Sequence, residues 1–341
     1  MSTELTLALD LGEDVLGEAL ATLEGFQNDA SEGINPLATL PLLKMQKPAT
    51  NTAKASVFDL ILGGESMWDA PKKEVFVVFT AWYGACTLWG PGKIEERKES
   101  GDLRPRCFTS FQSFKDFMQR RTSGTFRSHE GYDRDGKIIL GEPQEVKCSE
   151  CRWREFGSDA EWQDKEKNRK PAASQNLQVF VTFVEKVGDA KYKNSSIPVY
   201  EVQEDGTPYA LLNLSFATNM KAWTAFNQII ASKSSFGKVQ VPNQALVLKA
   251  SVATTGGDYN NPLLKLEWAG LLNPHPQAER GINFLRTQVI PGIQEFVMVA
   301  RKSGVVTSEM GTEDEGIPQV HPDDARRDGG GSEYPADEIP Y

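Results

Sequence analysis

Val75-Phe76-Val77-Val78-Phe79-Thr80-Ala81-Trp82-Tyr83 is the stretch that indicates the architecture of this chain most clearly. β-Branched and aromatic residues fill it, and such residues favour a buried β-strand. Further extended runs occupy residues 37–47, 177–184, 197–200, 210–216, 244–254 and 263–271. These runs predict a mainly β fold, and their order fits an OB-type Greek-key barrel. Other small β-barrels fit the same pattern, so the sequence leaves the barrel type open.

Helical periodicity occurs late in the chain. Asn219 is placed to cap a helix, and the apolar stripe of that helix consists of Trp223, Phe226, Ile229 and Ile230. We expect Trp223 to pack in the core. Residues 279–300 predict a second, mixed helix that is broken at Pro291-Gly292.

Composition divides the chain into three parts. Residues 1–36 contain an acidic amphipathic helix, residues 37–302 hold the strands, and residues 303–341 form a tail. Within the middle part, residues from about 105 to 176 predict an irregular, Cys-containing insertion. The tail has ten acidic residues and two arginines, which gives it −8 of the total net charge of −10. We therefore expect a disordered acidic tail, and the acidic balance does not argue against a middle part that binds nucleic acid.

Several classes of protein are disfavoured by composition. No apolar stretch approaches the roughly 20 residues that cross a bilayer, and the acidic N-terminus lacks the basic region of a signal peptide. Four cysteines in 341 residues fit a reducing compartment, so we expect a cytoplasmic protein without a membrane partner. No phosphate-binding loop, dinucleotide-binding motif, zinc-protease motif or nucleophile elbow occurs. We expect no enzyme, although a metal-dependent nuclease stays open because its carboxylates have no fixed spacing.

The end of the chain carries a docking motif. Asp337-Glu338-Ile339-Pro340-Tyr341 resembles the acidic C-terminal tip of bacterial-type single-stranded DNA-binding proteins, which typically read Asp-Asp-Asp-Ile-Pro-Phe. This chain departs from that pattern at Ala336 and in ending on Tyr rather than Phe. The resemblance implies that the tip recruits replication or recombination proteins such as a polymerase, helicase or primase. The alternative is a solubilising tail without a partner.

A second resemblance covers residues 37–272. Its landmarks, in order, are Leu40-Pro41-Leu42-Leu43-Lys44, Pro105-Arg106-Cys107-Phe108-Thr109-Ser110, Cys148-x-x-Cys151 with Gly157-Ser158, and the block at residues 213–223. Together they resemble phage-encoded single-stranded DNA-binding proteins with OB-type folds. Two departures are Asn219, where the family has Ser, and the absence of a further cysteine after the CxxC pair.

The cysteines suggest a structural zinc site. Cys148 and Cys151 have the spacing of a zinc-binding pair, and Cys107 is a third candidate ligand. For the fourth ligand the sequence offers His129, Cys86 or an acid such as Glu150 or Asp159. His129 lies in the same insertion and is preferred, whereas Cys86 lies in an apolar strand and is interpreted as a packed core thiol. The alternative is a relic of a site that has lost a ligand.

Binding of single-stranded DNA needs cations for phosphates and flat side chains for bases. The candidates for DNA contacts are Trp89, Arg104, Arg106, Phe108, Lys115, Arg120, Arg121, Arg152, Trp153 and Arg154. Trp153 lies between two arginines, so we expect it to be exposed to DNA. Phe111, Phe114 and Phe117 are spaced three residues apart. This spacing is typical of the buried face of a short helix, so we expect these rings to be buried rather than to contact DNA.

The resemblances and the residues together predict a single-stranded DNA-binding protein of phage type. It would coat and protect single strands in DNA replication or recombination in the host cytoplasm and recruit partners through its tip. One alternative is a protein–protein adaptor or virion component that does not bind DNA. A second alternative is a recombination strand-annealing protein.

Overall fold

The structure is a computed structural model of the chain. It describes residues 40–46, 56–90, 105–126, 130–132, 138–140, 145–159, 171–192, 195–204, 207–216, 218–233, 235–236, 239–254 and 262–303. The predicted N-terminal helix, the predicted disordered tail and its tip, Arg104 and His129 lie outside the described residues. No helix within the described ranges has both the length and the apolar character needed to span a membrane.

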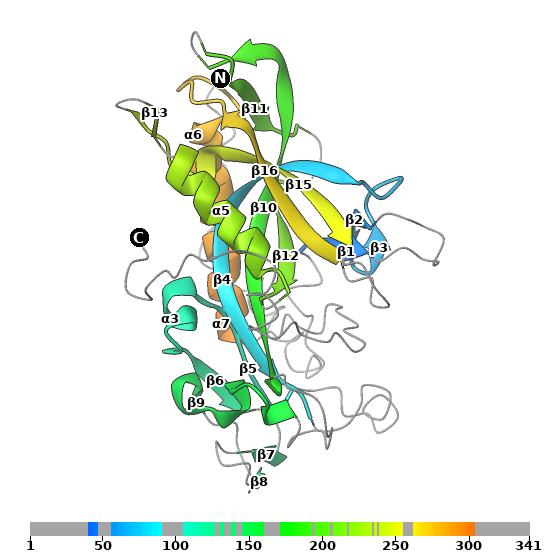
Figure 1. The fold of residues 1–341 in the computed structure, drawn as a ribbon, viewed down its shortest axis with the longest axis vertical. Coiled ribbons are helices and arrows are strands. Elements are labelled where there is room, and N and C mark those ends of the chain that lie inside the picture. The colour runs from blue at the N-terminus through cyan, green and yellow to red at the C-terminus, as the bar shows by residue number, and fades with distance from the viewer. Residues whose placement is uncertain are drawn as a thin grey trace, which may run out of the picture.

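Five strands close into a barrel (Figure 1). They are β4 (Glu74–Leu88), β10 (Ala173–Lys191), β11 (Pro198–Val202), β15 (Leu246–Thr254) and β16 (Pro262–Leu272). Around the ring, β4 pairs with β10, β10 with β11, β16 with β15, and β15 with β4, all antiparallel. The remaining pair, β11 with β16, is parallel. The predicted mainly β fold is confirmed, and the run at residues 75–83 lies inside β4.

Further strands extend the sheet from two sides of the barrel. Beyond β10 lie β12 (Ala210–Ser215), β1 (Leu42–Gln46), β2 (Val57–Leu62) and β3 (Glu65–Ser66). Beyond β4 lie β5 (Cys107–Ser113), β6 (Ser123–Phe126) and β9 (Glu145–Lys147). Two separate hairpins pair β7 (Glu130–Tyr132) with β8 (Ile138–Leu140) and β13 (Ser235–Phe236) with β14 (Val239–Gln240).

The insertion is more regular than the sequence indicates. In addition to β5 to β9, it contains α3 (Phe114–Met118) and the 3₁₀ turns η2 (Cys148–Glu150) and η3 (Arg152–Arg154). The prediction of an irregular segment is therefore wrong for residues 105–126, 130–132, 138–140 and 145–159. Its strands are short and carry glycine and charged residues, so they lack the period-2 pattern that marks a strand in sequence.

The interior of the barrel is closed by α5 (Met220–Lys233). Phe226 is fully buried, and its ring lies 4.8 Å from that of Phe79, 5.4 Å from that of Trp223 and 5.5 Å from that of Trp82. Trp223 packs in this cluster as predicted. Asn219 precedes the helix, and its side-chain oxygen accepts a hydrogen bond from the Leu264 amide at 3.1 Å, which ties α5 to β16.

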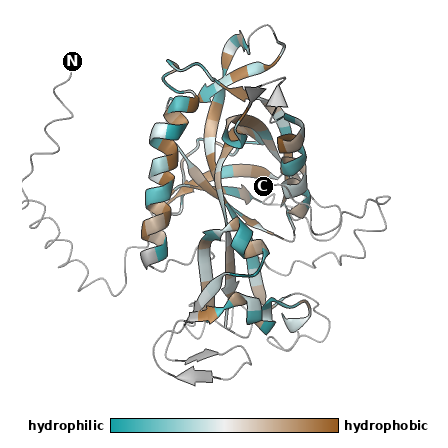
Figure 2. Cartoon of the chain, turned by 90° about the vertical axis from the view of Figure 1, so that its left-hand side faces the viewer, coloured by the Kyte–Doolittle hydropathy of each residue, from teal (hydrophilic) through white to brown (hydrophobic). Residues whose placement is uncertain are grey.

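A helical arm covers the outer face of the barrel on the opposite side, as Figure 2 shows. It consists of α6 (Ile282–Phe284), the π-helical turn η5 (Leu285–Val289) and α7 (Ile290–Ser303). Its buried residues are Leu285, Val289, Ile293, Val297 and Ala300. A separate 3₁₀ turn, η4 (Asn243–Ala245), precedes β15. The predicted break at Pro291-Gly292 is wrong, because both residues lie within a helical run that continues from the π-helical turn η5 into α7. The altered hydrogen-bond ladder of η5 directly precedes the proline.

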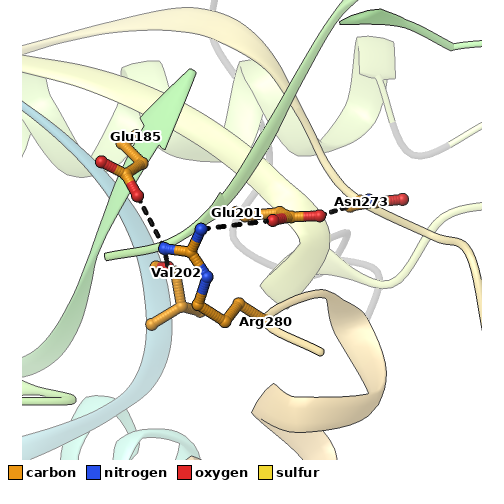
Figure 3. Close-up of polar contacts among 5 residues, drawn as sticks. All are labelled: Glu185, Glu201, Val202, Asn273 and Arg280. Atoms are coloured by element: carbon orange, nitrogen blue, oxygen red, sulfur yellow. Dashed lines mark hydrogen bonds and ion pairs between the residues drawn. The ribbon is translucent and has the colours of Figure 1, made fainter. Parts of the chain in front are cut away.

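The segment that leads into this arm is fixed by Arg280 (Figure 3). Arg280 Nη1 donates to Glu185 Oε1 at 2.6 Å and to the Val202 carbonyl at 3.0 Å, and Nη2 lies 3.7 Å from Glu201 Oε2. Asn273 Nδ2 donates to Glu201 Oε1 at 2.6 Å. These contacts hold the chain after β16 against the β10–β11 hairpin, so the helical arm starts from a fixed point.

Candidate nucleic-acid interface and cysteine cluster

The insertion connects β4 to β10 and forms a lobe at the far end of these two long strands (Figure 1). Its attachment depends on Gly84 of β4. A Cβ atom at this position would collide with the ring of Phe117, so glycine is needed for α3 to lie against the strand. The ring of Phe114 packs 4.7 Å from that of Trp223 on α5. The helix α3 therefore attaches the lobe to the barrel through two contacts, Phe117 against β4 and Phe114 against α5.

Phe111 lies inside β5, at the point where the register against β4 shifts between Gly84 and Cys86. Its backbone φ is 51°, in the left-handed region that non-glycine residues rarely adopt. The Phe111 amide donates to Gln178 Oε1 at 2.7 Å, and its carbonyl accepts from Arg301 Nε at 2.8 Å and from Arg301 Nη2. The expectation of buried rings is confirmed for Phe111 and Phe117, but Phe111 belongs to a strand rather than to the helix.

Four exposed cations lie on α3, on the turn that follows it and at the end of β9. This basic rim consists of Lys115, Arg120, Arg121 and Lys147. The pairing of Ser123 with Lys147 brings the end of β9 next to Arg121, and the Cys148 amide donates to the Thr122 carbonyl at 2.8 Å. The sequence indicates the first three residues but not Lys147, because nothing in it predicts that β6 and β9 pair.

Three of the predicted DNA contacts are buried. Trp153 is 4% exposed, Phe108 is 6% exposed and Arg154 is 2% exposed. The expectation of an exposed Trp153 is wrong, because the 3₁₀ turn after Cys151 directs it into a cluster with Cys86, Leu88 and Ala173. None of these three side chains can offer a surface to a base or a phosphate.

The remaining predicted contacts lie at the rim of this cluster. Trp89 and Arg106 are half-buried at the end of β4, where the Arg106 amide donates to the Leu88 carbonyl at 2.7 Å. Arg152 is half-buried, and its guanidinium carbon lies 4.5 Å from the centre of the Trp153 ring. The aromatic side chain that the turn does expose is Phe156, at 47%. Its position after the CxxC pair is no sequence signal of exposure, so the sequence did not predict this residue.

The four cysteines come together beneath this surface, and all are free thiols. Cys86 of β4 and Cys107 of β5 lie diagonally across neighbouring strands, because Cys86 is opposite Thr109 and Leu88 is opposite Cys107. A Cβ atom at Gly124 would lie 2.6 Å from Cys107 Sγ and 3.5 Å from Cys148 Sγ. Cys107 and Cys151 pack against the cluster that contains Cys86. Four thiols from three chain segments, namely β4, β5 and the CxxC turn, therefore lie close to one another.

Burial keeps these thiols protonated at neutral pH. It raises the pKa of Cys86 to about 12, although Arg154 opposes the increase, and the nearby Cys148 and Cys151 add to it. Burial also raises the pKa of Cys107 well above its usual value, with the other three thiols acting in the same direction. The pKa values of Cys148 and Cys151 are raised by burial too, and Arg154 opposes the increase at both. As they stand, no three His, Cys, Asp or Glu side chains among the described residues form a metal-binding group.

No protein-family model, curated protein or solved structure matches this chain. The strand order of the barrel, the chemistry of the insertion and the sequence of the tail therefore carry the functional assignment.

Proposed function

We propose that this protein binds single-stranded DNA and coats and protects it during phage DNA replication or recombination in the host cytoplasm. The observation that carries the proposal is the strand order of the closed barrel. With β4, β10, β11, β15 and β16 numbered one to five, the ring runs 1-2-3-5-4-1, and the pair 3–5 is parallel. The helix α5 lies between the third and fourth strands. An OB-type Greek-key barrel has this order, and such barrels bind oligonucleotides.

The insertion occupies the place of one of the two binding loops of such a barrel. In OB folds the connection between strands one and two and the connection between strands four and five contact oligonucleotides. Here the first connection is the lobe that carries the basic rim and Phe156. The second connection, residues 255–261, lies outside the described residues. The proposed strand therefore runs along the lobe, with its phosphates against the basic rim and a base on Phe156.

The sheet face of strands two and three is assigned no role in stacking. Phe180 and Val184 of β10 and Tyr200 and Val202 of β11 are buried under the helical arm. Bases cannot reach these side chains while α7 is in place. This packing is the physical reason for placing the contacts on the lobe.

Phe156 supplies the first test of this placement. Stacking of a base on an aromatic ring contributes about 1–3 kcal/mol, so Phe156→Ala should weaken oligo-dT binding by that amount, with little change in salt dependence. Fluorescence anisotropy of a labelled oligo-dT measures both quantities. Met118→Ala is the matched control, because Met118 is an exposed apolar residue of the same lobe. Unchanged affinity in Phe156→Ala would refute the stacking role.

We propose that the tail recruits partner proteins, namely a replication or recombination polymerase, helicase or primase. Deleting residues 333–341 should leave or raise oligo-dT affinity and abolish recruitment, because the deletion removes acidic residues that compete with phosphates for the basic rim. Anisotropy and co-purification with these host enzymes check the two effects. A double variant, Ile339→Ala with Tyr341→Ala, keeps the acidic side chains and should lose recruitment alone. Loss of DNA binding in the deletion would contradict this division of labour.

A further inference from the structure

Cys86 lies with the three cysteines of the insertion although it belongs to a barrel strand. It comes from the second half of β4, beyond the part that lines the barrel interior, and it packs with Trp153 directly after the CxxC turn. Its diagonal neighbour on the adjacent strand β5 is Cys107. Gly124 lies against both Cys107 and Cys148, since a Cβ atom there would collide with Cys107 Sγ at 2.6 Å and would contact Cys148 Sγ at 3.5 Å.

Arg154 gives an independent indication of what this volume holds. The residue is 2% exposed, and its Nε and Nη1 atoms are buried without a hydrogen-bond partner. Its Nη2 atom reaches the Phe117 carbonyl and Gln175 Oε1, both at 3.4 Å, and the guanidinium lies over the Phe117 ring. No carboxylate in the described ranges pairs with it. A buried cation without a counter-charge costs several kcal/mol, so a negative centre is expected beside it.

We propose that Cys86, Cys107, Cys148 and Cys151 bind one structural Zn²⁺ and that Arg154 is the buried counter-cation of this centre. Binding exchanges four thiol protons for the metal, which gives a tetrathiolate of net charge −2 next to the guanidinium. Thiolates are soft ligands that suit Zn²⁺, and four of them complete its tetrahedron. As they stand, the four thiols do not form a metal-binding group, so binding of Zn²⁺ requires their side chains to reorient.

This assignment differs from the sequence-based one in its fourth ligand. The sequence favours His129 because it lies in the insertion, and it favours a packed core thiol at Cys86. Cys86 is buried, as expected of a core thiol, and it also packs in the cluster that Cys107 and Cys151 contact. The site would join β4, β5 and the turn that follows Lys147, and so fix the basic rim relative to the barrel. The proposed zinc site does not depend on whether the protein binds DNA.

The test is the metal content and ligand set of the full-length protein. Elemental analysis of protein purified without chelators should give one zinc per chain and no iron. After exchange with Co²⁺, the thiolate-to-cobalt charge-transfer intensity should correspond to four sulfur ligands. This second measurement uses the unmodified chain, so it decides the question even where a cysteine variant fails to fold.

Variants then separate the two candidate ligands. Cys86→Ser should lose zinc, whereas His129→Ala and Ser149→Ala, the latter an exposed change inside the CxxC turn, should keep one zinc per chain. Arg154→Gln should weaken zinc binding about 10–100-fold, as loss of a group that supports metal ligands commonly does. Zinc loss in His129→Ala with retention in Cys86→Ser, or a cobalt spectrum of three thiolates, would overturn the assignment. Protein that holds no metal and takes up none, or that holds iron with visible absorption, would overturn it as well.

Discussion

Removing three cations of the basic rim is expected to weaken oligo-dT binding about a hundred-fold at 0.1 M salt. The variant combines Arg120→Asn, Arg121→Ala and Lys147→Ala. Each phosphate contact to a single strand contributes about 0.7 to the slope of log K against log salt, so three contacts contribute about 2. Asn is chosen at Arg120 because its backbone φ is 53°, and Asn tolerates the left-handed region. Anisotropy titrations at several salt concentrations give the affinity and the slope together.

The control variant loses the same number of positive charges at positions outside the insertion. Lys73, Lys265 and Arg286 are exposed and lie outside the insertion, so replacing all three by alanine should leave the slope within about 0.5 of the wild-type value. Equal losses in the two triple variants would mean that net charge governs binding. In that case the basic rim would not be the interface.

Phe226→Ala is expected to cause the largest loss of stability, about 3–5 kcal/mol in the free energy of unfolding. The side chain is fully buried in the barrel interior among three aromatic rings, and a cavity there cannot collapse while β-strands surround it. Urea unfolding followed by tryptophan fluorescence measures the change, which should appear as a lower midpoint at an unchanged denaturant slope.

Met220→Ala is the matched control for the barrel. Met220 lies on the same helix and is exposed, so its loss should change the free energy of unfolding by less than about 0.5 kcal/mol. A small effect of Phe226→Ala, comparable to that of Met220→Ala, would show that α5 does not close the barrel.

The two central strands of the barrel, β4 and β10, were predictable from sequence because they are long and mostly apolar. Residues 75–83 and 177–184 are buried on both faces, one toward α5 and the other toward the helical arm, so they form continuous hydrophobic runs. The insertion lacked such a signal. β6 and β9 have four and three residues, and their pairing depends on contacts between distant segments.

The candidate site was predictable in part. Three of the four residues of the basic rim were found because they stand close together in sequence, whereas Lys147 is brought to them by strand pairing. Flanking arginines suggested that Trp153 is exposed, yet Arg154 is buried with it. Cys86 stands 62 residues before Cys148 in the chain, and no spacing rule connects a strand residue to a CxxC turn at that distance.

The most direct test of the proposed function is fluorescence anisotropy of a labelled oligo-dT titrated with the full-length protein. The titration is run at low and at moderate salt, with the matching duplex as competitor. Tight binding that weakens with salt and survives the duplex is the predicted result, because bases stack only when they are unpaired. Absence of binding even at low salt would contradict the account, and a protein–protein adaptor would then be the better interpretation of the barrel and the tail.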